Sequence, residues 1–198
     1  MSYTEFSIVD LKTKFQLEFI ENQELFPQPA DYDVSQELRA LLKEFVPLAL
    51  AIDTEKARSE LIVAPLLAKL KLGLANVSLF SGIEFNIDRE QGLTGRCDFI
   101  LSRSNEQYQL DAPVVMVVEA KNDNIKSGIP QCGAEMVAAL RFNLDKNNPI
   151  EAVYGCITTG SLWHFLKLRD KTFYIDTSEY HIQFLERIMG ILAAILTE

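Results

Sequence analysis

The sequence predicts an α/β domain in which helices pack on both faces of a mixed sheet. Segments with helical spacing of apolar residues alternate with short apolar segments, in the order helix, three strands, helix, strand, strand pair, helix. The 198 residues, 48% of them hydrophobic, are enough to bury one substantial core. We expect a single domain over residues 1–198: an amino-terminal extension over 1–50 packed on a core over 51–176, and a carboxy-terminal helix over 177–198.

The first fifty residues are expected to be irregular apart from helices. The stretch IVDLKTKF, residues 8–15, favours a short helix, and the prolines and aspartates of PQPADYD indicate a loop. Ser35 is expected to cap a longer helix that reaches residue 52. Pro47 should end or kink that helix, because proline removes a backbone donor.

The core is expected to begin with a helix over residues 54–72, which Asp53 caps and which carries Glu55 in its first turn. Three segments rich in β-branched and aromatic residues follow, each bounded by turn-forming residues. We therefore expect strands over 77–87, 95–101 and 113–120.

A second core helix is expected over residues 127–145, with Ser127 or Gly128 as its cap. This start places Pro130 in the first turn, where a missing amide costs little. The remaining predicted elements are strands over 151–158, 162–168 and 172–176, followed by an amphipathic carboxy-terminal helix.

Composition restricts the classes of function. A formal net charge of −9 argues against a broad basic surface for nucleic acid, so such a partner would need a local basic patch or a metal ion. The apolar run IMGILAAIL is shorter than the roughly 20 residues of a membrane-spanning helix. Because the amino terminus MSYTEFSIVD does not resemble a secretory leader, we expect a cytoplasmic protein without a membrane partner.

Cysteine and histidine usage gives no sign of a zinc site. Cys97, Cys132 and Cys156 lie in apolar contexts and are expected to be buried free thiols in a reducing compartment. His164 and His181 are isolated, whereas zinc sites use paired cysteines or histidines at short spacing.

Two opposite charges end the apolar stretch VVMVVEAK. Side chains alternate along a strand, so Glu119 and Lys121 should share a face with Val115 and Val117, while Ala120 points to the other face. A strand that emerges into solvent would also end on charges. The pair indicates a functional site only if other charged residues also lie at core positions.

Two further carboxylates occupy such positions. Asp98 in GRCDFIL is followed directly by strand-type apolar residues, although the end of a turn would also explain it. Glu60 shares a helical stripe with Ala57, Ala64 and Leu67, and the alternatives are a salt bridge to Arg58 or a half-exposed position.

Carboxylates that converge at one edge of a sheet repel each other unless a cation neutralises them. Mg²⁺ suits such a site because it prefers oxygen ligands and retains several waters. A lysine beside the metal could orient water and offset charge during phosphodiester hydrolysis. The alternative is a structural ion-pair network around a buried polar pocket.

At this point residues 50–176 resemble the PD-(D/E)XK nuclease superfamily, and most nearly the amino-terminal nuclease domain of type I restriction motor subunits. The resemblance rests on Glu60 in ARSELI, Asp98 in GRCDFIL, and Glu119 with Lys121 in VVEAKN. It implies a restriction endonuclease-like α/β/α sandwich with a mixed central sheet and the core order αβββαβ.

The resemblance also implies the roles of site residues. Asp98, Glu119 and the carbonyl of Ala120 would hold Mg²⁺, for which Mn²⁺ can substitute, and Lys121 would act on water or charge. Catalytic assistance would come from Glu60 and from Gln131 on the following helix. The implied activity is hydrolysis of nucleic acid, with DNA preferred to RNA.

The sequence departs from the family pattern at two positions. Cys97 replaces the signature proline, and Glu135 stands where one branch has an aromatic residue four positions after its glutamine. CITTGSLWHFLKL resembles a segment of the type I restriction branch, but an ordinary hairpin with Trp163 in the core explains it equally. A catalytically silent domain that binds other proteins is the alternative function, and homodimerisation through the carboxy-terminal helix or another exposed face is left open.

Overall fold

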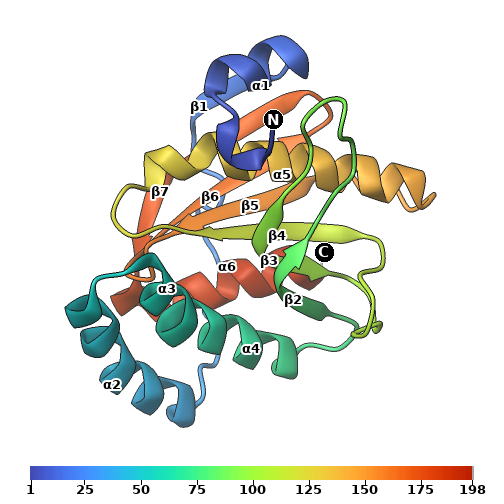
Figure 1. Cartoon of the computed structure of the whole chain (residues 1–198). Coiled ribbons are helices and arrows are strands. Elements are labelled where there is room, and N and C mark those ends of the chain that lie inside the picture. Colours follow the sequence, from blue (N-terminus) through green and yellow to red (C-terminus); the bar gives the residue numbers. More distant parts are fainter. Residues whose placement is uncertain (198) are drawn as a thin grey trace.

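The computed structural model describes residues 1–197 and contains one open, mixed sheet of seven strands (Figure 1). The spatial order is β1-β7-β6-β5-β4-β3-β2, with β1–β7 and β4–β5 parallel and the other pairs antiparallel. The predicted α/β class and mixed sheet are therefore confirmed. The strands are β1 (Glu18–Gln23), β2 (Ser78–Glu84), β3 (Arg96–Ser102), β4 (Val114–Ala120), β5 (Val153–Thr158), β6 (Leu162–Arg169) and β7 (Thr172–His181).

Helices cover both faces of this sheet (Figure 1). One face, here called the α5 face, packs against α5, α1 and the short turn η1; the other, the α6 face, packs against α2, α4 and α6. The helical elements are η1 (Tyr3–Glu5), α1 (Ile8–Lys14), α2 (Gln36–Ile52), α3 (Glu55–Arg58), the π-helix η2 (Ser59–Val63), α4 (Ala64–Gly73), α5 (Ile125–Asp145), η3 (Ile182–Phe184) and α6 (Leu185–Thr197).

Strand β4 contains a bulge that corrects one predicted side-chain position. Leu101 of β3 pairs with Met116, whereas the next β3 residue pairs with Val114, so Val115 is the extra residue between them. Val115 consequently packs on the α6 face, while Val117 remains on the α5 face. The predicted alternation thus holds only from Met116 onward.

The amino-terminal extension contributes an edge strand that the sequence did not predict. Residues 18–20 of β1 pair in parallel with residues 172–174 of β7. Strand β7 is also longer than the expected 172–176, because it continues to His181 beside β6. The extension is therefore part of the sheet and does more than pack on it.

The junction between α2 and α3 differs from the predicted one. Pro47 does not end α2, which continues to Ile52. Asp53 adopts a left-handed conformation with φ of 54° and ends α2, so it does not cap the next helix. That role belongs to Thr54, whose hydroxyl accepts a hydrogen bond from the Ala57 N–H at 3.1 Å.

The start of α5 is likewise earlier than predicted. Neither Ser127 nor Gly128 is its cap; Asn124 Oδ1 accepts a hydrogen bond from the Ser127 N–H at 3.3 Å. The helix therefore begins at Ile125, and Pro130 lies beyond its first turn. The sequence signal was ambiguous because serine and asparagine are both favoured caps.

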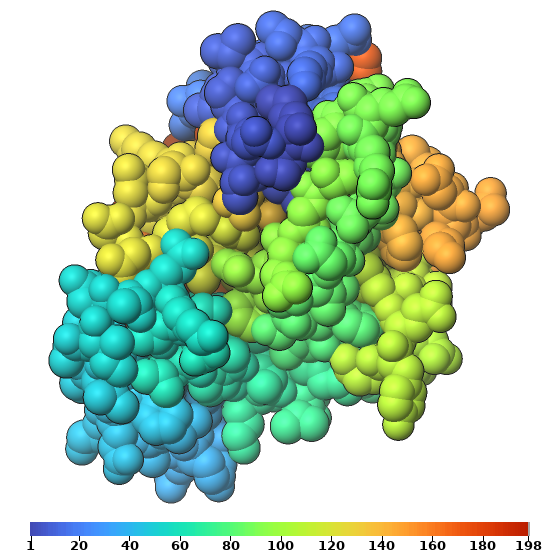
Figure 2. Space-filling model, viewed as in Figure 1, coloured from blue at the N-terminus to red at the C-terminus, as the bar shows by residue number. Residues whose placement is uncertain are grey.

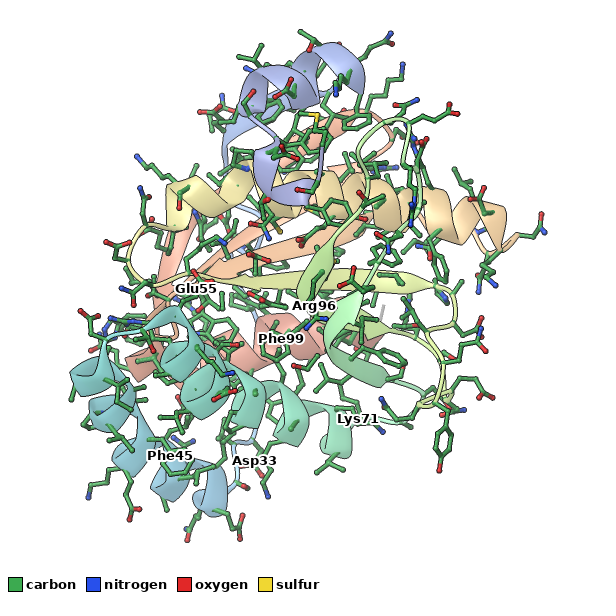
Figure 3. All side chains as sticks on the ribbon, in the orientation of Figure 1. Asp33, Phe45, Glu55, Lys71, Arg96 and Phe99 are labelled. Atoms are coloured by element: carbon green, nitrogen blue, oxygen red, sulfur yellow. The ribbon has the colours of Figure 1, made fainter. Side chains whose placement is uncertain are left out.

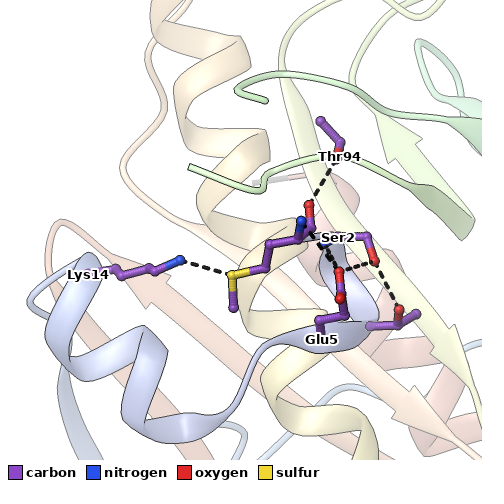
Figure 4. Close-up of polar contacts among 6 residues, drawn as sticks. Ser2, Glu5, Lys14 and Thr94 are labelled. Atoms are coloured by element: carbon purple, nitrogen blue, oxygen red, sulfur yellow. Dashed lines mark hydrogen bonds and ion pairs between the residues drawn. The ribbon is translucent and has the colours of Figure 1, made fainter. Parts of the chain in front are cut away.

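The amino-terminal turn is anchored to the loop between β2 and β3 (Figure 4). Tyr3 donates from its N–H to the Thr94 carbonyl at 3.0 Å and from its hydroxyl to the Phe85 carbonyl at 2.6 Å. Lys14 Nζ donates to Met1 Sδ at 2.9 Å, which joins α1 to the same turn. These contacts bury the Tyr3 ring at the α5 side of the sheet.

Helix α6 packs its apolar side chains on the sheet. Ile188, Ile191 and Leu192 are fully buried in the core of the α6 face. The apolar side of α6 is therefore covered by the sheet and is not available to a second copy of the chain. In the part of the chain that the structure describes, no helix is long and apolar enough to cross a bilayer.

Asn143 fixes α5 against the start of β4. Its side-chain carbonyl accepts from the Val114 N–H at 2.7 Å, and its amide donates to the Val114 carbonyl at 2.8 Å. The side chain is fully buried. It therefore satisfies two backbone groups that have no access to solvent.

We predict that Asn143→Leu lowers the free energy of unfolding by about 2 to 4 kcal/mol, because both Val114 backbone groups would lose their partner. Urea denaturation followed by circular dichroism measures the change. Asn105→Leu is the control, since Asn105 forms its side-chain hydrogen bond in an exposed loop. Equal stability of the two variants would contradict the proposed role of Asn143.

Candidate active site

The sheet opens between β3 and β4 at the carboxyl end of β4. Pairing between these strands stops at Phe99 and Val118. Beyond that point β3 continues beside β2 as far as Arg96, and β4 continues beside β5 as far as Ala120. The two strands thus form a fork, and backbone groups inside it need other partners.

Asp98 lies inside this fork. Its Oδ2 accepts a hydrogen bond from the Ala120 N–H at 2.8 Å, in place of a backbone partner across the ladder. Burial raises the pKa of Asp98, while this hydrogen bond and the charge of Lys121 act in the opposite direction. Since β3 begins at Arg96, Asp98 is a strand residue and not the end of a turn.

Glu119 is the most deeply buried carboxylate of the fork, with 2% of its surface exposed. Its Oε1 accepts a hydrogen bond from Lys121 Nζ at 2.6 Å, whereas its Oε2 is buried without a hydrogen-bond partner among residues 1–197. Burial and the nearby charge of Asp98 raise the pKa of Glu119 to about 7, against the opposing effect of Lys121.

Lys121 is held between two acceptors. Its Nζ donates to Glu119 Oε1 at 2.6 Å and to Gln131 Oε1 at 3.2 Å. Burial lowers the pKa of Lys121, but the carboxylates of Glu119, Glu55 and Asp98 together outweigh this effect and the net pKa is raised. Gly128 leaves room for the side chain, because a Cβ there would lie 3.3 Å from Lys121 Cε and 2.8 Å from Ile157 Cγ2.

Gln131 links this lysine to a carboxylate that the sequence analysis did not assign to the site. Gln131 Nε2 donates to Glu135 Oε1 at 3.2 Å, one helical turn along α5. Glu135 has no exposed surface, and burial followed by the charge of Glu119 raises its pKa well above the ordinary value. A charged residue within the apolar stretch CGAEMVAAL was the available signal.

The prediction that Glu60 points inward from the apolar stripe of its helix is wrong. Glu60 is exposed and lies 3.6 Å from Lys56 in an ion pair on the helix surface. The cause is the π-helix from Ser59 to Val63, which adds a residue to one turn and shifts the phase of the side chains. The stripe projected from Ala57 therefore does not pass through Glu60.

Glu55, at the start of α3, acts electrostatically on the residues of the fork. Its charge raises the pKa of both Glu119 and Lys121. Figure 3 places Glu55 at the start of α3, close to the end of β4 in that view. The sequence indicated Glu55 only as an acidic residue of a first helical turn, because its proximity to Glu119 and Lys121 depends on tertiary packing.

Arg58 attaches α3 to the loops around the fork. Its guanidinium donates to Asn122 Oδ1, to the Thr159 carbonyl and to Asp53 Oδ1, each at 3.1 Å. Only 12% of its side chain is exposed. In the space-filling view the surfaces of α3 (teal), β3 (green) and the start of α5 (yellow) adjoin on one side of the molecule (Figure 2).

The carboxylates of the fork are candidate ligands for a divalent metal ion. In residues 1–197, no group of three or more histidine, cysteine, aspartate or glutamate side chains is arranged to hold one. The two carboxylates of Asp98 and Glu119, with the unpartnered Glu119 Oε2, still fit Mg²⁺, because this ion commonly uses one or two carboxylates and completes its shell with water.

The structure therefore brings together most of the predicted site residues: Asp98, Glu119, Ala120, Lys121 and Gln131. Glu60 is separate from them, while Glu55, Arg58 and Glu135 are additional neighbours. Neither a scan against protein-family models nor a search of curated protein sequences finds a match to the chain. The geometry of the site is consequently the basis for proposing a function.

The raised pKa of Glu119 gives a prediction for stability without metal. The folded protein binds the proton of Glu119 more tightly than the unfolded chain, in which this carboxyl group has its ordinary pKa of 4.5. The stabilisation of the fold by this proton is therefore complete at pH values below 4.5. It is lost as pH rises through about 7. We therefore expect Glu119→Gln to raise the Tm relative to the natural protein at pH 8 in EDTA, and to do so much less at pH 5.

Thermal unfolding at both pH values measures this difference. Glu44→Gln is the control, because Glu44 is exposed on α2, away from the fork. A loss of stability in Glu119→Gln at pH 8 would indicate instead that Glu119 and Lys121 form a stabilising structural ion pair.

Proposed function

We propose that this protein is a Mg²⁺-dependent nuclease with a restriction endonuclease-like fold, related to the PD-(D/E)XK superfamily. It hydrolyses phosphodiester bonds of nucleic acid, with DNA preferred to RNA. One observation carries the proposal: the fork between β3 and β4 holds Asp98, the unpartnered Oε2 of Glu119 and the ammonium of Lys121 at one place.

Asp98, Glu119 and the Ala120 carbonyl are the groups that would hold the metal ion. When bound, Mg²⁺ or Mn²⁺ polarises the phosphate and lowers the pKa of a coordinated water. The protein excludes bulk water from the deeper side of this site, since Glu119 and Ala120 are buried. A dry, preorganised environment increases the strength of electrostatic interactions with a reacting group.

Lys121 would act directly on the reaction. Its ammonium is tethered by Glu119 and Gln131 and retains partial exposure, with 16% of the side chain accessible. From this position it can donate a hydrogen bond to a water or to a phosphate oxygen. Gln131 limits its movement, and Glu55 contributes negative charge beside it.

Local cations, rather than the whole surface, would have to attract the nucleic acid, because the net charge is −9. Lys126 is exposed at the start of α5, whereas Arg96, exposed at the start of β3, forms a surface ion pair with Glu84 at 3.3 Å. Arg141 is less available, since it donates to Asp88 Oδ2 at 2.6 Å. Few phosphate contacts imply weak sequence-independent binding and only a shallow decrease of activity with salt, because the salt dependence scales with the number of contacts.

Cleavage assays test the proposal. Purified protein with Mg²⁺ or Mn²⁺ should cleave plasmid, linear or single-stranded DNA faster than RNA, and Lys121→Met should reduce the rate about 100-fold or more. Lys43→Met is the matched control, because Lys43 is an exposed lysine on α2 with no assigned role. Equal rates for the natural protein and Lys121→Met would exclude the proposed site.

The alternative function is a catalytically silent domain that binds other proteins, which the acidic composition favours. Calorimetric titration with Mn²⁺ separates the two. The nuclease proposal predicts binding that Asp98→Asn reduces about 10-fold or more, because one of two carboxylate ligands loses its charge. Asp33→Asn, in an exposed loop, should bind like the natural protein. Absence of Mn²⁺ binding would favour the silent domain.

A further inference from the structure

Glu135 poses a question that the packing of α5 does not answer. Its side chain has no exposed surface, and its Oε2 has no hydrogen-bond partner among the residues described. An unpaired buried carboxyl oxygen destabilises a fold, and an apolar residue would fill the same space without that cost. Stability therefore does not account for a carboxyl group at this position.

The hydrogen bonds of Gln131 indicate the role of the Glu135 carboxyl group. A side-chain amide has one accepting end and one donating end, and the two can exchange by rotation. The Lys121 ammonium can only donate, so it requires the Gln131 oxygen. The Gln131 amino group is then directed into the protein interior, where it needs an acceptor.

Glu135 Oε1 is that acceptor, at 3.2 Å from Gln131 Nε2. Either protonation state of the carboxyl group offers an accepting oxygen, so the arrangement does not depend on its charge. The contacts form a continuous series from Glu135 through Gln131 to Lys121, and end at Glu119 Oε1. The orientation of each side chain in this series is set by its hydrogen bond to the preceding one.

We propose that Glu135 is a positioning residue: it fixes the side-chain amide of Gln131 and thereby holds the Lys121 ammonium between two acceptors. Without Glu135, the Gln131 amide rotates and Lys121 retains only Glu119. The lysine would then be held by a single acceptor and would no longer keep a fixed position toward water or phosphate. The catalytic consequence rests on the proposed nuclease function, whereas the placement of Lys121 does not.

Glu135→Met tests this role, because methionine fills the space of glutamate but accepts no strong hydrogen bond. We expect an unchanged or higher Tm together with a kcat lowered about 10- to 100-fold and little change in KM. Glu135→Gln retains an accepting oxygen and should recover much of the lost rate. A purely structural role would instead lower Tm and activity together, and Glu44→Met on the exposed side of α2 controls for the introduction of methionine.

A spectroscopic measurement separates this proposal from the nuclease proposal. The ¹⁵Nζ resonance of Lys121, assigned by its loss in Lys121→Met, should show slow hydrogen exchange in the natural protein. Exchange should accelerate in Glu135→Met and slow again in Glu135→Gln. If the natural protein cleaves no nucleic acid but these changes occur, the nuclease proposal fails and the positioning role stands. Unchanged exchange in Glu135→Met would overturn the positioning role.

Gln131→Leu provides a second test if Glu135→Met does not fold. Removing the intermediate amide should accelerate hydrogen exchange at Lys121 Nζ as well. In a folded double variant, the two substitutions should be non-additive, because they interrupt the same series of contacts. Additive effects, or no effect of Gln131→Leu, would show that Glu135 does not act through Gln131.

Discussion

The hydrogen bond from the Ala120 N–H to Asp98 Oδ2 is the interaction on which the site depends. It occurs where β3 and β4 cease to pair, so it satisfies an amide that would otherwise lose its partner. It also brings the Asp98 carboxylate beside Glu119, although like charges repel. One bond thus gives the backbone a partner and places two acids together.

The surrounding fold tolerates this unfavourable arrangement because stability comes from elsewhere. Large apolar clusters on both faces of the sheet bury most of the hydrophobic side chains, and α5 is fixed to β4 by Asn143. Among the buried side-chain polar atoms without a hydrogen-bond partner in residues 1–197, the two that belong to carboxyl groups, Glu119 Oε2 and Glu135 Oε2, lie at or beside the fork. Unpaired carboxyl groups of this kind are typical of sites shaped by function.

Sequence patterns predicted the order of the core elements and the grouping of Asp98, Glu119 and Lys121, whereas Gln131 was assigned only through the resemblance to a nuclease superfamily. These predictions succeeded because strand alternation and the helical repeat are fixed by backbone geometry. They failed for Glu60 because a π-helix changes the repeat without an obvious residue signature.

Other features could not be predicted from local sequence patterns, because distant parts of the chain determine them. The bulge at Val115 depends on the register between β3 and β4, and the strand character of β1 depends on its partner β7. Glu135 could be recognised as unusual from its apolar context, but its contact with Gln131 required the structure.

The edge strand β1 has a consequence for synthesis of the protein. Its parallel partner is β7, so residues near Phe19 cannot pair until those near Phe173 have left the ribosome. All the strands and the helix that build the fork precede residue 160. The nascent chain can therefore assemble its interior strands first, and close the exposed edge of β7 last.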